Sequence, residues 1–357
     1  MSTVKRYAAL DAMRGLTVAT MLFVNNAGDW SHVYPWLEHA AWHGCTPADF
    51  IFPFFLFILG ASIAMSVDAQ LSKGMDVADV RKKILWRSLR LFVLGIVLHL
   101  VAWALIDGRH FRLLGVLQRI GICYAVIACM ITYVCQLSRQ VLLCVVAMLA
   151  YWALLFWGGS YEPHMNLVDK IDSTMLGKLA YSYDVQTGLA QDPEGLLSTL
   201  MAMASVLTGV WAGRAMRDAQ LMQMLASAAG LILLALIWSA YLPFNKQLWT
   251  PSFVCWTSAW AILLLLGMHM LIDKQGWPAI GKSLGVNAIA AYAGAWLATC
   301  VLAWTGWATT IYQLVFVAVL QKQTGEEFAS FAYTICFTLV FAALALVMNK
   351  KGWRITI

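Results

Sequence analysis

The chain has 357 residues, of which 61% are hydrophobic and only 12% are charged. A soluble domain has about 25% charged residues, so this chain has too few charges to cover a water-facing surface. Its net charge of +6 does not indicate a nucleic-acid partner, because the cations cluster in one set of loops between apolar runs. The composition therefore predicts a protein whose main partner is the lipid bilayer, with no nucleic acid bound.

Ten apolar runs approach the length of about 20 residues that a helix needs to cross a bilayer. They lie near residues 12–29, 48–67, 86–106, 113–135, 140–157, 194–213, 222–242, 252–272, 284–304 and 327–348. A shorter run at 311–321 cannot span alone and is expected to form an interfacial or re-entrant helix. We therefore predict an all-α, polytopic membrane protein with about ten transmembrane helices, forming one domain over residues 1–357.

The loop cations indicate the orientation of these helices. Sixteen Lys and Arg residues, Lys5 and Arg6 among them, fall on the side that carries both termini, and six fall on the opposite side. The positive-inside rule then places both termini in the cytoplasm. Two long loops, 30–47 and 158–193, face outward in this topology, and long loops often carry function.

The densest cluster of chemically active side chains lies just outside the second run and contains His39, Trp42, His43 and Asp49. An imidazole is the usual general base near neutral pH, and a neighbouring carboxylate fixes its tautomer and raises its basicity. His39 could thus take a proton from an amine or hydroxyl, with Asp49 orienting it. Two alternatives stay open. His39 and His43 are spaced so that they could bind one metal ion. A third ligand is not obvious beyond Asp49, so we expect no metal site. The cluster could also be interfacial, with no chemistry.

Polar side chains inside spanning runs are costly and by default mark a pathway or a site. Asn25 and Asn26 lie at the outer end of the first run, and at least one of them is expected to line a cavity. Asn287, beside a glycine in the ninth run, suits a cavity wall. Arg119 lies within the fourth run, where it could hold the helices together or hold an anionic ligand.

Charged pairs stand at the entrances of two runs. Asp11 and Arg14, three residues apart on one helix face, could form a structural ion pair or contribute to a site. Asp192 and Glu194 precede the sixth run from the outside. They could cap that helix and complement its dipole, or they could attract a cationic ligand to an outer mouth.

Eight ordered blocks extend over nearly the whole chain. They are LDAMRGLTVATMLFVNNAG, EHAAWHGCTPADFIFPFFLFILGASI, WRSLRLF, GVLQRIGICY, DPEGLLST, NKQLWTPSFV, GVNAIAAY and NKKGWRITI. These blocks resemble the heparan-α-glucosaminide N-acetyltransferase family and its bacterial relatives, some of which are labelled as N-acetylglucosamine-related transporters. Eight blocks in order are far more specific than a single short motif.

The resemblance implies an activity and a catalytic centre. The family moves acetyl from cytosolic acetyl-coenzyme A, the donor substrate, to a glucosamine amine on the far side of the membrane. His39 aligns with the catalytic histidine of the family pattern His-Ala-Ser-Trp-Asn-Gly, and Asn25 and Asp49 align with polar residues of neighbouring blocks. We therefore expect an acetyltransferase with His39, Asp49 and Asn25 at its catalytic centre and His39 as general base. Direct attack by the amine and an acetyl-histidine intermediate both stay open.

The remaining polar residues are assigned to the two substrates. The expected acceptor contacts are Trp42, His43, Asp192, Glu194 and Asn287. The expected coenzyme A contacts are Arg14, Arg87, Arg90 and Arg119. Anchoring at the membrane surface also accounts for the basic segment 78–90, which contains Arg87 and Arg90.

The chain departs from the family pattern on the acceptor side. His43 stands where the lysosomal enzyme has asparagine, and loop 158–193 is short by comparison. The heparan acceptor is therefore not carried over. In a bacterial inner (cytoplasmic) membrane the acceptor is expected to be free glucosamine, a chitosan fragment or a cell-wall sugar. The alternative function is an inner-membrane transporter of an amino sugar or N-acetylglucosamine. A homodimeric assembly is left open.

Overall fold

The structure, a computed structural model, describes residues 7–355. Lys5 and Arg6, which contribute to the predicted orientation, lie outside the described residues.

Helices make up most of the described chain. Their bounds are α1 (Ala8–Val24), α2 (Ile51–Ser72), α3 (Val77–Leu105), α4 (Val116–Tyr133), α5 (Leu137–Trp157), α6 (Leu167–Met175), α7 (Leu196–Arg217), α8 (Leu221–Ser239), α9 (Pro251–Met268), α10 (Lys282–Val286), α11 (Ala288–Trp304), α12 (Trp307–Ile311), α13 (Lys322–Thr324) and α14 (Glu326–Lys350). Short 3-10 turns form η1 (Pro35–Leu37), η2 (Pro47–Phe50) and η3 (Gly177–Leu179), and π-helical segments form η4 (His269–Lys274) and η5 (Tyr312–Gln321). Strands β1 (Ser182–Tyr183) and β2 (Ala190–Gln191) pair antiparallel within the loop 158–193.

Eight helices within residues 7–355 are long and apolar enough to cross a bilayer. A ninth span results if α11 is counted together with the bent segment that follows it. Every predicted run falls on a helix, but α1 has only 17 residues and the ninth run is divided at Asn287 into α10 and α11. The mostly helical, polytopic prediction is confirmed in this coarser form, while the count of ten and the cytoplasmic placement of the termini stay predictions.

Helix α3 begins nine residues before the predicted run. Asp76 caps it by accepting a hydrogen bond from the Ala78 amide at 3.1 Å. The first turns carry exposed Lys82 and Lys83, which end an apolar run in the sequence but do not end a helix. Hydropathy detects only the part of a helix that lipid surrounds, so α3 is longer than the run that revealed it.

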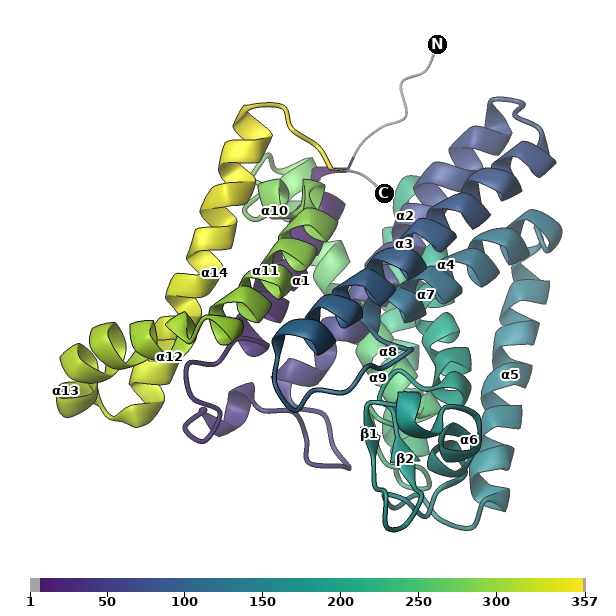
Figure 1. The fold of residues 1–357 in the computed structure, drawn as a ribbon. Coiled ribbons are helices and arrows are strands. Elements are labelled where there is room, and N and C mark those ends of the chain that lie inside the picture. The colour runs from purple at the N-terminus through teal and green to yellow at the C-terminus, as the bar shows by residue number, and fades with distance from the viewer. Residues whose placement is uncertain (1–6, 356–357) are drawn as a thin grey trace.

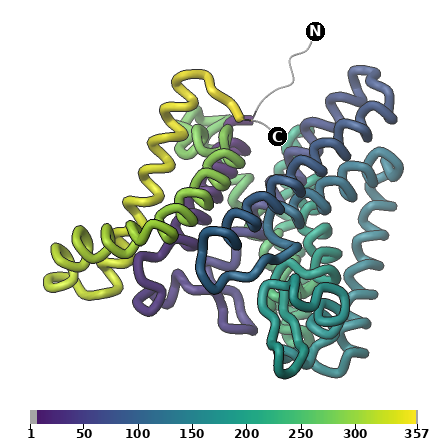
Figure 2. Tube along the Cα trace, viewed as in Figure 1, coloured from purple at the N-terminus to yellow at the C-terminus, as the bar shows by residue number. Residues whose placement is uncertain are grey.

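The helices run back and forth between two ends of the bundle. Figure 1 shows the start of α1 and the end of α14 at one end, with the loop after α1 and the loop that carries β1, β2 and α6 at the other. The tube in Figure 2 shows the same arrangement. Helix α2 packs against α7, α3 against α4, and α8 against α9. Both long loops that the sequence singled out therefore lie at the same end.

The short run at 311–321 forms η5, between α12 and α13. This segment is bent by 88° from α11, at Gly306, whose φ of 73° lies in the left-handed region that glycine adopts readily. Tyr312 and Phe316 are buried, whereas Leu314 and Val319 are exposed. The segment therefore presents one apolar side to the protein and another outward, as expected for an interfacial or re-entrant helix.

Helices α2 and α7 approach so closely that their backbones touch at glycines. A Cβ built at Gly60 would overlap the carbonyl of Val206, and one at Gly209 would overlap the carbonyl of Phe57. Small residues commonly permit such close contact between membrane helices. Because α2 begins two residues after Asp49, this contact also positions the start of α2 beside Asp49.

The substitution Gly209→Ala should destabilise the protein by about 1–3 kcal/mol, since the added methyl group forces α2 and α7 apart. Thermal unfolding of purified protein in detergent would measure the effect. The control is Gly230→Ala in α8, where a Cβ would have no neighbour within 4 Å. Alanine forms helix better than glycine, so the control should be neutral or slightly stabilising. Equal unfolding temperatures for the two variants would contradict the close contact.

Candidate active site

Asp49 is the buried centre of the predicted cluster. Its side chain is 1% exposed. One oxygen accepts hydrogen bonds from the amides of Ala40 and Thr46, at 3.1 and 3.0 Å, and from the Thr46 hydroxyl at 3.1 Å. With Thr46 it forms a capping box that starts η2 and leads into α2. The carboxylate therefore folds the loop 40–46 onto the start of α2.

His39 contacts the other oxygen of Asp49. The distance from His39 Nδ1 to Asp49 Oδ1 is 2.8 Å, and the His39 side chain is 43% exposed. An ionised carboxylate only accepts hydrogen bonds, so Nδ1 carries a proton, and in the neutral imidazole the lone pair is then on Nε2. A half-exposed imidazole oriented by a buried carboxylate is the arrangement of a general base.

Lys246, which sequence reasoning did not assign to the site, lies against the same imidazole. Its Nζ is 3.1 Å from His39 Nδ1, 3.2 Å from His39 Nε2 and 3.6 Å from Asp49 Oδ1. The residue belongs to the block NKQLWTPSFV, and it is one of the few lysines on the predicted outer side. That exceptional position was the signal available in the sequence.

Trp42 and His43 connect this cluster to two further loops. The Trp42 indole donates to the carbonyl of Tyr161 at 2.8 Å, in the loop 158–193. His43 Nε2 is 3.4 Å from Glu162 Oε1, and His43 Nδ1 is 3.4 Å from the side-chain nitrogen Nδ2 of Asn245. Three loops distant in sequence thus meet around His39.

His39 and His43 do not share a ligand. His39 faces Asp49 and Lys246, whereas His43 faces Glu162 and Asn245. Within residues 7–355, no three His, Cys, Asp or Glu side chains are grouped as a metal site would require.

The two predicted asparagines lie at opposite ends of the bundle. Asn25 is exposed and ends α1 on the side of the long loops. Asn287 is buried between α10 and α11, and its Oδ1 accepts a hydrogen bond from the Ile355 amide at 3.2 Å. Figure 1 places α10 at the end where α1 begins. The structure therefore does not bring Asn287 together with His39.

The four arginines predicted for the donor have separate surroundings. Arg14 bonds to Asp11, Ser62 and the Gly285 carbonyl and so connects α1, α2 and α10. Arg87 lies 5.2 Å from the ring centre of Tyr124. Arg90 is exposed beside Trp86.

Arg119, the fourth, is 1% exposed and lies against the start of α7. It donates to Ser198, Thr199 and the Gly195 carbonyl. Its Nη1 has no hydrogen-bond partner among the described residues. These contacts join α4 to α7 and leave one buried donor of Arg119 unused.

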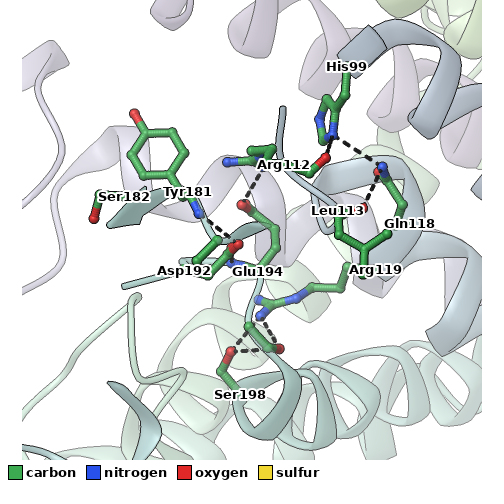
Figure 3. A network of polar contacts seen from close by, with 12 residues as sticks. His99, Arg112, Leu113, Gln118, Arg119, Tyr181, Ser182, Asp192, Glu194 and Ser198 are labelled. Carbon is green, nitrogen blue, oxygen red and sulfur yellow. Dashed lines mark hydrogen bonds and ion pairs between the residues drawn. The ribbon is translucent and has the colours of Figure 1, made fainter. Parts of the chain in front are cut away.

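Asp192 and Glu194 belong to a buried charge network with Arg112 and Arg119 (Figure 3). Arg112 Nη2 is 2.9 Å from Glu194 Oε2, with side-chain exposures of 12% and 10%. Asp192 accepts from the amides of Tyr181 and Glu194, at 3.0 and 2.9 Å. Both acidic side chains therefore contact other protein groups and do not line an open outer mouth. Asp192 accepts the Glu194 amide in the turn that precedes α7.

His99 and Gln118 extend the network towards α3 and α4. His99 Nδ1 donates to the Arg112 carbonyl at 2.9 Å, and the Gln118 amide donates to the Leu113 carbonyl at 3.1 Å. His99 is thus a buried core histidine whose Nδ1 has a hydrogen-bond partner.

The carboxyl groups of the buried charge network titrate differently. Burial and the neighbouring Glu194 raise the pKa of Asp192 to about 7. Burial also opposes ionisation of Glu194, but Arg112 and Arg119 outweigh it and lower the pKa of Glu194. Glu194 is therefore the ionised member of the pair that balances the arginines.

Removing Arg112 should be strongly destabilising, since it leaves Glu194 buried without its partner. We expect Arg112→Met to lower stability by about 3–5 kcal/mol, and a second substitution, Glu194→Gln, to restore part of the loss. Arg109→Met, at an exposed arginine of the same loop, should cost less than about 1 kcal/mol. Thermal unfolding in detergent provides the measurement. Purely additive effects of the two substitutions would show that the pair does not interact.

Comparison with known proteins supports the resemblance found in the motifs. A family model described as "Heparan-alpha-glucosaminide N-acetyltransferase, catalytic" matches residues 6–170. The mouse heparan-α-glucosaminide N-acetyltransferase is 29% identical over 354 residues, covering 82% of this chain and 54% of the mouse protein. The human protein is 28% identical over 352 residues, covering 81% and 52%.

The chain therefore spans about half the length of the curated relatives it matches. The matched family region contains His39, Trp42, His43 and Asp49, and ends before Asp192 and Lys246. Over most of its length the chain is similar to the heparan-α-glucosaminide N-acetyltransferases, as its sequence motifs predict.

Proposed function

We propose that this protein is a transmembrane N-acetyltransferase that moves acetyl from cytosolic acetyl-coenzyme A to the amine of an amino sugar at the outer face. The observation that carries the proposal is the 2.8 Å contact between His39 and the buried Asp49 at the end of the bundle where both long loops lie. The relatives that the chain resembles are named for acetyl transfer to glucosaminide.

The chemistry requires a base that is free when the acceptor amine arrives. With its proton on Nδ1 held by Asp49, His39 has its lone pair on Nε2, which the amine has to reach beside Lys246 Nζ, 3.2 Å from that atom. The amine then attacks the thioester carbonyl directly, and His39 takes the proton that the nitrogen loses. General-base help of this kind contributes roughly 10²–10⁴-fold, and alignment of the two substrates contributes the larger part.

Around this base, Trp42 and His43 are the proposed acceptor-side contacts, and Asn25 stays a proposed member of the catalytic centre. Glu162, whose side chain is 62% exposed next to His43, adds a carboxylate that can bind a sugar ammonium before it loses its proton. His43, which departs from the family pattern, therefore lies next to Glu162. Glu162 belongs to the loop 158–193, which is short compared with that of the lysosomal enzyme.

On the donor side, Arg119 is a proposed contact of coenzyme A. Its guanidinium lies 5.1 Å from the ring centre of Trp249 and 5.9 Å from that of Phe52, and its buried Nη1 has no protein partner in the part of the chain that is described. Arg87 and Arg90 on α3 are the proposed cytoplasmic phosphate contacts. The proposed location is the bacterial inner membrane.

The first test is acetyl transfer from labelled acetyl-coenzyme A to glucosamine by purified protein. Wild type should transfer acetyl, and His39→Ala should reduce turnover by at least about 10²-fold. His110→Ala, at an exposed histidine of another loop at the same end, should retain activity. If wild type neither transfers acetyl nor binds coenzyme A, but exchanges labelled amino sugar across liposomes, the transporter is the correct function. Full activity of His39→Ala would exclude the proposed base.

Asp49→Asn should lower kcat by about 10²–10⁴-fold, because an amide can hold the imidazole in the wrong tautomer. The exposed Asp184 provides a matched control, and Asp184→Asn should leave kcat unchanged. Coenzyme A binding and unfolding temperature should be measured for both variants, since Asp49 also caps η2. An active Asp49→Asn variant would show that the carboxylate serves only the fold.

A further inference from the structure

Lys246 is positioned by a loop that the surrounding elements hold from several sides. This loop, residues 240–250, joins α8 to α9. The Phe244 carbonyl accepts from the Gly44 amide at 2.7 Å, and Asn245 Oδ1 accepts from the Leu248 amide at 2.8 Å. The Tyr151 hydroxyl donates to the Leu248 carbonyl. Lys246 is therefore not a freely moving surface lysine.

The loop also stores backbone strain next to Lys246. Trp249 is 1% exposed and has φ of 51°, in the left-handed region that a bulky residue rarely adopts. Its indole donates to Ser205 at 3.2 Å. Strain of this kind persists only where the surrounding structure over-determines the conformation, and it is concentrated at functional sites.

The groups that interact with Lys246 come from three parts of the chain. Asp49 approaches from η2, His39 and Cys45 from the preceding loop, and Glu194 from the start of α7. Burial lowers the pKa of Lys246, and the two carboxylates oppose that shift. Asp49 already has the donors His39, Ala40 and Thr46. Lys246 is thus an additional cation that the capping of η2 does not require.

We propose that Lys246 is a catalytic residue whose ammonium group binds the thioester carbonyl oxygen and carries the negative charge that develops there. The proposal rests on the acetyl transfer proposed above. An amine bonded to His39 Nε2 lies about 3 Å from it, and a thioester in position for attack lies about 3–3.5 Å from the amine. Because Nζ is 3.2 Å from Nε2, a thioester that approaches the amine on the side of Lys246 has its carbonyl oxygen within reach of the ammonium group.

The step balances without another reactant. The amine nitrogen forms a bond to the carbonyl carbon, and the carbonyl electron pair moves to the oxygen beside Lys246. The nitrogen loses its proton to His39 Nε2. The oxyanion then reforms the carbonyl as the carbon–sulfur bond breaks, and the imidazolium gives its proton to the leaving thiolate. Lys246 keeps its proton throughout, as an electrostatic stabiliser does.

Three variants test the role of Lys246 in purified protein with acetyl-coenzyme A and glucosamine. Lys246→Met should lower kcat by about 10²–10³-fold, as removal of one oxyanion donor does elsewhere, with little change in KM for the donor. Lys246→Arg should retain an intermediate rate, because it keeps the charge in a different shape. Lys170→Met, at an exposed lysine of another outer loop, should match wild type. Wild-type kcat in Lys246→Met would overturn the proposal. Inactive wild type would instead refute the proposed acetyl transfer.

The pH profile separates this role from a structural one and does not need the Met variant to fold. Lys246 acts while protonated, so activity is present below its pKa and is lost as the pH rises through it. Because that pKa lies below the usual lysine value, kcat of wild type should fall at alkaline pH. In Lys246→Arg the guanidinium stays charged, and the decline should move to higher pH. An alkaline decline at the same pH in both proteins would overturn the proposal.

Discussion

The site depends on one buried carboxylate. Asp49 accepts from two backbone amides, one hydroxyl and one imidazole, and it is itself almost fully covered. Ionised groups are expensive to bury unless such donors surround them, so the loop 40–46 must close over α2 for Asp49 to be stable there. The same closure directs His39 outward. The capping of η2 and the orientation of His39 are therefore one structural event.

A membrane bundle restricts where such a site can form. Within lipid the backbone must be helical, so irregular chain that can carry a base and bind a polar acceptor is confined to the ends. Here Trp42 and His43 hold the loop after α1 against the loops 158–193 and 240–250. The glycine contacts between α2 and α7 set the distance between two of the helices that carry these loops.

The features that were predictable from the sequence are those governed by local rules. Lipid imposes length and apolarity on spanning helices, so the runs identified the helices. Lys82 and Lys83 concealed the start of α3, and the break at Asn287 between α10 and α11 left no gap in the ninth run. His39 and Asp49 are ten residues apart, and their pairing followed from residue type and proximity.

Contacts that join distant segments left no local pattern. Lys246 is 207 residues from His39, and Arg112 is 82 residues from Glu194. Asp192 and Glu194 could be read equally as caps or as an open acidic mouth, because burial is a property of the packed bundle. Similarly, the run that contains Asn287 does not say which end of the bundle that residue occupies.

The charges of the site and of the buried charge network form one alternating series. Glu194 interacts with Arg112 and Arg119 on one side and with Lys246 on the other, and Lys246 lies in turn between Glu194 and Asp49. Each cation thus has a carboxylate neighbour that compensates its burial, and each carboxylate has a cation or His39. The members come from the starts of α2, α4 and α7 and from the loop before α9. Because unpaired charge is so costly in a weakly solvated interior, this series favours one relative placement of those elements. The geometry around His39 is therefore set by electrostatic balance as well as by packing.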